Sequence, residues 1–271
     1  MGNQKQKLEG DSMQSIDPKR VAEQMMVFIK NAFNKERHAN AVIGLSGGID
    51  SATSCALVTR ALGANHVYPV LLPYGSLSNE GTKDARLVID WLKIPEKQVR
   101  VIDIQPMVDA GVNTIDSAMD EGRRGNIMAR MRMVVLYDLA KAMPALVIGT
   151  ENKTEHLLGY YTKFGDEASD IEPLRHLYKT QVYELARYLD VPEKILSKPP
   201  TAGLWEDQTD EGEFGFTYKE VDEVLFLHFD QHVSKEAIIK RGYNKKTIER
   251  MWWWIEKGRF KDRLPVILQE R

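Results

Sequence analysis

The sequence contains a single cysteine, Cys55, among its 271 residues. One cysteine excludes an intramolecular disulfide framework and a zinc site built from several cysteines. No apolar run approaches the roughly 20 residues that a transmembrane helix needs, and residues 1–15 lack the apolar core of a signal peptide. These absences predict a cytoplasmic protein without a membrane partner, in which Cys55 packs in the interior.

An excess of charge of either sign is also absent, because 37 Lys and Arg face 39 Asp and Glu, giving a formal net charge of −2. A protein that binds nucleic acid usually carries a basic excess, so no nucleic-acid partner is expected. Residues 1–16 are interpreted as a polar tail that is disordered or derived from the expression vector. Residues 17–271 are interpreted as a single domain.

Short apolar runs alternate with helix-like segments along the first 190 residues. The predicted strands are 41–45, 67–72, 99–104 and 145–149, and the predicted helices begin at Pro18 or span 51–63, 79–92, 125–142, 151–158 and 178–189. Such alternation is typical of a doubly wound parallel sheet with helices on both faces. Ligands of these sheets bind beyond the carboxyl ends of the strands. Two or three further helices are expected after residue 198.

The most informative segment joins the first predicted strand to the next helix. It consists of Gly44, Leu45, Ser46, Gly47, Gly48, Ile49, Asp50 and Ser51. Small residues in this position let backbone N–H groups surround an anion, and the helix N-terminus adds a partial charge of about +0.5. The serines offer hydroxyl donors, and Asp50 offers a hard oxygen ligand for Mg²⁺. The alternative is a Gly-rich turn in which Asp50 and Ser51 only cap the helix.

This loop resembles the S-G-G-x-D-S loop of the ATP pyrophosphatases, which split ATP into AMP and pyrophosphate. Three later segments extend the resemblance to the ammonia-dependent NAD⁺ synthetases. They are G-T-x-x-x-x-E at 149–155, T-x-[FY]-G-D at 162–166 and P-T-A at 200–202. The likeness covers residues 17 to 265. It implies an α/β fold of the adenine nucleotide alpha hydrolase type, with a doubly wound parallel sheet and a helical C-terminal extension.

The resemblance implies that ATP adenylates the nicotinate carboxylate of deamido-NAD⁺ and that ammonia then displaces AMP. It also implies that Asp50 and Glu155 hold Mg²⁺, and that Asp166 and Lys179 are catalytic. ATP, the co-substrate, would contact the loop Gly44–Ser51 together with Thr150, Lys179 and Thr201. Deamido-NAD⁺ would contact Arg130, Lys163, Asp170 and Lys261.

Members of the family often carry a His-Lys pair that reaches deamido-NAD⁺ across a dimer interface, which implies a homodimer here. In this chain Phe260 stands in the histidine position before Lys261. Many members also have an arginine just after the second strand, where residues 71–74 are Leu-Leu-Pro-Tyr.

Only about 40 residues precede the loop, too few for an amidase domain that would release ammonia from glutamine. Free ammonia, or ammonia from another protein, is therefore expected. The acidic residues 204–216 are predicted to be mobile, either as a surface loop or as a lid. The alternatives to NAD⁺ synthesis are another ATP pyrophosphatase, GMP synthetase-like or tRNA-modifying, and a non-catalytic nucleotide-binding module.

Overall fold

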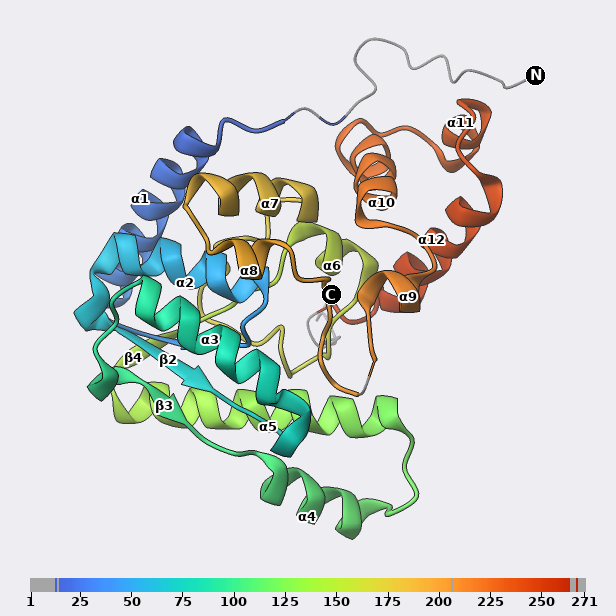
Figure 1. Cartoon of the computed structure of the whole chain (residues 1–271). Coiled ribbons are helices and arrows are strands. Elements are labelled where there is room, and N and C mark those ends of the chain that lie inside the picture. The colour runs from blue at the N-terminus through green and yellow to red at the C-terminus, as the bar shows by residue number, and fades with distance from the viewer. Residues whose placement is uncertain (1–12, 14, 206, 264–266, 268–271) are drawn as a thin grey trace.

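The structure is a computed structural model that describes residues 13, 15–205, 207–263 and 267. The predicted tail lies outside the described residues except for Met13, Ser15 and Ile16. Figure 1 shows the strands enclosed between helices. No helix in the described ranges is both long and apolar enough to cross a membrane.

The described strands form one parallel sheet in the order β3-β2-β1-β4. Their bounds are β1 (Asn40–Gly44), β2 (Val67–Leu71), β3 (Arg100–Val101) and β4 (Ala145–Ile148). The parallel sheet is confirmed, but the predicted third strand, 99–104, is too long. Beyond β3, Ile104 N–H donates to Pro73 O (2.9 Å), and proline has no N–H with which to return a hydrogen bond. The ladder therefore stops there.

Helices cover both faces of the sheet (Figure 1). One face packs against α1 (Pro18–Glu36), α2 (Ile49–Leu62), α3 (Asn79–Trp91), α7 (Lys179–Tyr188) and α8 (Glu193–Leu196), and the other against α4 (Gln105–Ile115) and α5 (Glu121–Ala142). Neighbouring strand residues serve opposite layers, because Ile43 joins the first hydrophobic cluster and Val42 the second. The doubly wound arrangement is confirmed. Short 3-10 turns occupy η1 (Ala64–His66), η2 (Gly75–Ser78) and η3 (Glu96–Gln98).

Two helical predictions on the second face were incomplete. Helix α4 was not predicted, although Val108 and Val112 bury one of its faces at helical spacing. Helix α5 begins at Glu121 rather than at residue 125, because Asp120 caps it by accepting the Arg123 N–H (2.9 Å). Cys55 has no exposed surface within α2, and burial raises the pKa of its thiol to about 12, so its predicted interior packing is confirmed.

The C-terminal part packs as a separate helical layer around α6 (Lys153–Leu158). Within the described residues this layer holds more α-helices than the two or three predicted. They are α9 (Asp210–Phe214), α10 (Tyr218–Leu225), α11 (Lys235–Lys240) and α12 (Lys245–Gly258), with a π-helical turn, η4 (Phe226–Asp230). The layer lies beside α6 and α7 (Figure 1), so it borders the carboxyl edge of the sheet.

Phe33→Ala is expected to lower the free energy of unfolding by about 3–5 kcal/mol, because the Phe33 side chain is only 2% exposed within the core. Phe28→Ala removes the same atoms from a side chain on the same helix that is 50% exposed, and it should cost far less. Urea unfolding of both variants measures the difference. Equal losses would contradict the assignment of the core face of α1.

Candidate functional site

The loop between β1 and α2 is folded around its own serines. Ser46 Oγ and Ser51 Oγ lie 3.0 Å apart, and Gly48 N–H donates to Ser46 Oγ (3.2 Å). Gly47 has a φ of 81°, and a Cβ there would lie 2.5 Å from Gly81 O of α3. Glycine is therefore required where the loop passes α3. The predicted order of strand, turn and helix is confirmed.

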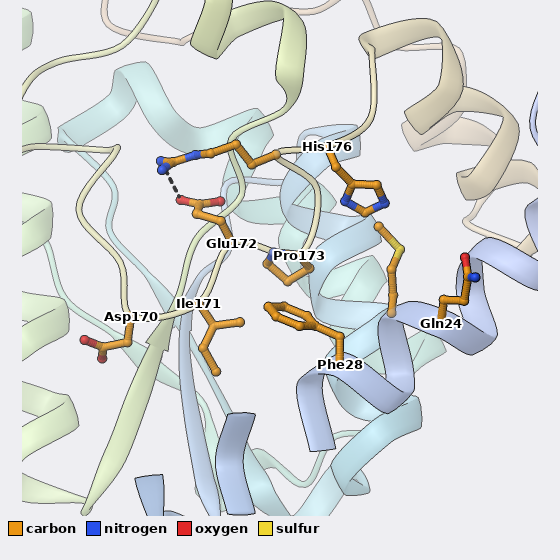
Figure 2. A pocket seen from close by; sticks show the side chains of 9 residues that line it. Gln24, Phe28, Asp170, Ile171, Glu172, Pro173 and His176 are labelled. Carbon is orange, nitrogen blue, oxygen red and sulfur yellow. Dashed lines mark ion pairs between the residues drawn. The ribbon is translucent and has the colours of Figure 1, made fainter. Parts of the chain in front are cut away.

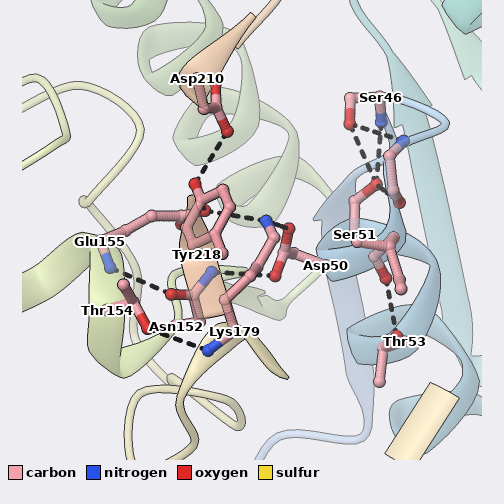
Figure 3. Close-up of polar contacts among 12 residues, drawn as sticks. Ser46, Asp50, Ser51, Thr53, Asn152, Thr154, Glu155, Lys179, Asp210 and Tyr218 are labelled. Atoms are coloured by element: carbon pink, nitrogen blue, oxygen red, sulfur yellow. Dashed lines mark hydrogen bonds and ion pairs between the residues drawn. The ribbon is translucent and has the colours of Figure 1, made fainter. Parts of the chain in front are cut away.

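Lys179 lies at the centre of the predicted metal and phosphate residues (Figure 3). It begins α7, and its side chain is only 2% exposed. Its Nζ lies 2.5 Å from Asp50 Oδ2 on α2 and 3.0 Å from Glu155 Oε1 on α6. We call these three residues the lysine–carboxylate cluster. The sequence predicted all three as site residues, but it assigned Lys179 to phosphate rather than to the two carboxylates.

The charges in this cluster shift one another's protonation. Burial alone would lower the pKa of Lys179, but the carboxylates of Asp50, Glu155 and Asp210 outweigh burial and raise it well above its usual value. Burial raises the pKa of Glu155 to about 8, against the opposing charge of Lys179, and Asp50 and Asp210 add to the rise. Three carboxylates thus face one ammonium group, so two negative charges are unmatched when all four are ionised.

This surplus of carboxylate fits a divalent cation. In the described part of the chain, no group of three His, Cys, Asp or Glu side chains forms a metal cage by itself. Mg²⁺ does not require one, since it is usually bound by one or two carboxylates together with substrate phosphates and water. Asp50 and Glu155 supply such hard oxygen donors, and both now contact Lys179.

Asn152 is a residue of this site that the sequence analysis missed. Its Nδ2 donates to Asp50 Oδ1 (3.0 Å), and its Oδ1 accepts the Glu155 N–H (3.0 Å). Asn152 therefore caps α6 and links the two predicted metal ligands. An asparagine three residues before Glu155 is a recognisable N-cap signal, and it also explains why the helix begins after the predicted residue 151.

Asp222 is a second missed residue, fully buried on α10. It accepts hydrogen bonds from Thr154 Oγ1 (2.5 Å) on α6 and from the Thr180 N–H (2.8 Å) on α7. Thr154 Oγ1 in turn accepts the Lys179 N–H (2.9 Å). One carboxylate from the C-terminal layer thus fixes the starts of the two helices that carry Lys179 and Glu155.

The remaining predicted ATP contacts follow β4 and precede α9. Thr150 lies just beyond β4, at the same sheet edge as the loop after β1. Thr201 is exposed, and its Oγ1 accepts the Gly203 N–H (3.0 Å).

Three of the predicted deamido-NAD⁺ residues gather near the C-terminal segment. Arg130 donates to the Lys163 carbonyl (3.3 Å), and Lys163 Nζ donates to the Arg263 carbonyl (2.8 Å). Lys261 Nζ donates to the carbonyls of Gly159 and Tyr161, at 2.7 and 2.5 Å.

Asp170, the fourth predicted deamido-NAD⁺ residue, lies beside β4. Its Oδ2 accepts the Val147 N–H of β4 (2.8 Å), and in Figure 2 its carboxylate points away from Phe28. Asp170 and Phe28 line a cavity of about 500 Å³ together with Glu172, Arg175 and other residues.

Asp166 ends the predicted T-x-[FY]-G-D turn. Its Oδ1 accepts the Thr162 N–H (2.8 Å), and Thr162 Oγ1 bonds Asn126 of α5 (2.8 Å). Surrounding protein desolvates the Asp166 carboxylate and raises its pKa, although part of the side chain reaches solvent. A raised pKa makes this carboxylate a stronger base, and its exposure leaves it open to a reacting group.

The family model described as NAD synthase matches residues 21–265. The chain is 43% identical to a protein from Pyrococcus horikoshii named NH(3)-dependent NAD(+) synthetase, over 94% of this chain and 96% of that protein. A solved structure of NMN synthetase from Francisella tularensis superimposes with a TM-score of 0.83 at 36% identity, covering 94% of this chain and all of that one. An NH3-dependent NAD synthetase from Campylobacter jejuni superimposes with a TM-score of 0.78 at 30% identity, with coverage of 94% and 100%.

The raised pKa of Glu155 predicts a pH dependence of stability. Between its usual pKa and about 8 the folded state binds this proton more tightly than the unfolded state, so Glu155 costs stability as pH rises through that window. Glu155→Gln should therefore gain stability relative to the unsubstituted protein from pH 5 to pH 8, by roughly 1 kcal/mol or more. Urea unfolding at both pH values measures this. The exposed Glu256→Gln is the control, and equal pH dependence in both variants would contradict the prediction.

Proposed function

The chain belongs to the NAD synthase family, a family of ligases, and we propose that it converts deamido-NAD⁺ to NAD⁺ with ATP and ammonia, releasing AMP and pyrophosphate. The observation that carries this proposal is the contact of Lys179 with both Asp50 and Glu155. It joins the first turns of the helices that follow β1 and β4 to the start of α7, at the carboxyl edge of the sheet, where parallel sheets bind their ligands.

In the proposed first step, a carboxylate oxygen of deamido-NAD⁺ attacks the α-phosphorus of ATP, and the bond to pyrophosphate breaks. The backbone of Gly44–Ser51, with Thr150 and Thr201, would hold the nucleotide. Asp50 and Glu155 would hold Mg²⁺, which when bound neutralises the charge of the departing pyrophosphate. Lys179, released from its two carboxylates, would contact the phosphates as a point charge.

In the proposed second step, ammonia attacks the carbonyl carbon of the acyl adenylate, and the bond to AMP breaks. The attacking nitrogen must lose a proton, and Asp166 is the proposed acceptor. Arg130, Lys163, Asp170 and Lys261 are proposed to bind deamido-NAD⁺. The proposal keeps the homodimer and the cytoplasmic location that the sequence analysis predicts. It also keeps the predicted mobility of residues 204–216, of which residue 206 lies outside the described residues.

Pyrophosphate release by the purified protein with ATP and Mg²⁺ tests this function. We expect release to require deamido-NAD⁺, and NAD⁺ to appear only when ammonium is added. Deamido-NMN is a necessary second arm, because one of the similar structures is named an NMN synthetase. Release with deamido-NMN alone would overturn the dinucleotide substrate, and release with neither would overturn the function.

Asp166→Asn should lower the rate of NAD⁺ formation at saturating ammonium by about 10²–10⁴-fold, the usual contribution of a positioned general base. The same variant provides the control. Pyrophosphate leaves in the first step, so Asp166→Asn should still release it once per site when ammonium is absent. Unchanged turnover at saturating ammonium would remove Asp166 from the second step.

A further inference from the structure

The acidic residues 207–215, which we call the acidic segment, contain one buried carboxylate that contacts the site, that of Asp210. Asp210 begins α9 and is only 3% exposed. Its N–H donates to the Pro200 carbonyl (3.1 Å), its Oδ2 accepts from Tyr218 Oη (2.8 Å), and its Oδ1 accepts from Tyr160 Oη (3.2 Å). Asp210 therefore ties the P-T-A segment and two tyrosines to one point of the acidic segment.

Of these two tyrosines, Tyr218 also reaches the lysine–carboxylate cluster (Figure 3). It begins α10 with 4% of its surface exposed, and its Oη lies 3.4 Å from Glu155 Oε1. Lys179 Nζ lies 5.0 Å from the centre of its ring. A phenol has one proton to donate, so Asp210 and Glu155 compete for it, and the shorter contact is with Asp210.

We propose that Tyr218 is a positioning residue that couples the acidic segment to Glu155, so that occupation of the site by Mg²⁺–ATP tightens the attachment of α9. This inference rests on the function proposed above. Once Glu155 is engaged by the cation, the Tyr218 hydroxyl is committed to Asp210. Asp210 N–H also donates to the Pro200 carbonyl, so a tighter attachment of Asp210 would also hold Thr201, the next residue, more firmly.

Tyr160 provides a matched control. Its Oη lies 3.2 Å from Asp210 Oδ1 and 2.9 Å from Glu213 Oε2, so two carboxylates of the acidic segment share its one proton, and its ring packs against Phe214 at 4.5 Å between centroids. Tyr160→Phe therefore loosens the same helix by removing one hydrogen bond to a carboxylate of the acidic segment. Only Tyr218→Phe also removes the contact with Glu155.

The test is hydrogen exchange of the backbone amides of residues 209–216 in the full chain, with and without Mg²⁺–ATP. In the absence of ligand, each variant should exchange about fivefold faster than the unsubstituted protein, the effect of one lost hydrogen bond. Mg²⁺–ATP should slow exchange in the unsubstituted protein and in Tyr160→Phe, but not in Tyr218→Phe. The Mg²⁺ concentration for half-maximal NAD⁺ formation should rise in Tyr218→Phe more than kcat falls.

Equal responses of the two variants to Mg²⁺–ATP would overturn the coupling, as would unchanged exchange in the unsubstituted protein that binds ATP. Equilibrium dialysis with labelled ATP separates this from a failure of the proposed function, in which ATP is not bound at all. If Tyr218→Phe does not fold, Glu155→Gln tests the same contact from its other side. That variant should alter exchange in residues 209–216 without ligand, and no change there would overturn the proposal.

Discussion

The ion pairs of Lys179 with Asp50 and Glu155 are the interaction on which the rest of this site depends. Isolated charges are costly to bury, so the Lys179 ammonium needs the carboxylates and each carboxylate needs the ammonium. Because the three residues come from α2, α6 and α7, their pairing fixes the relative positions of three elements that are remote in sequence. The sheet brings these elements to one edge, and the cluster determines how closely they approach.

Two residues near the cluster, Asn152 and Gly47, each hold neighbouring elements together. Asn152 uses one end of its amide to cap α6 and the other to hold Asp50. Gly47 lets the loop after β1 pass against the backbone of α3, where any side chain would collide with Gly81 O. Asn152 thus satisfies a backbone N–H at the start of α6, and Gly47 lets the loop pack closely against α3.

The sequence was sufficient for features encoded by local patterns. Strand and helix alternation predicted the parallel sheet, and the resemblance carried by the motifs implied that Asp50, Glu155 and Lys179 belong to one site. The sequence was insufficient where contacts between distant residues determine which side chains meet. Tyr218 has the appearance of a core aromatic residue, and no local pattern shows that its hydroxyl meets Asp210. Helix α4 was missed because its buried face is short. Strand β3 was predicted too long because Pro73, just after the neighbouring strand β2, has no N–H to continue the ladder.

Asp222 has a consequence for the order in which the molecule is assembled. Its contacts with Thr154 and Thr180 span 68 and 42 residues of sequence. During synthesis, which proceeds from the N-terminus, the sheet and the first loop are complete long before this carboxylate leaves the ribosome. The contacts of Asp222 that hold the starts of α6 and α7 can therefore form only after most of the chain has been synthesised.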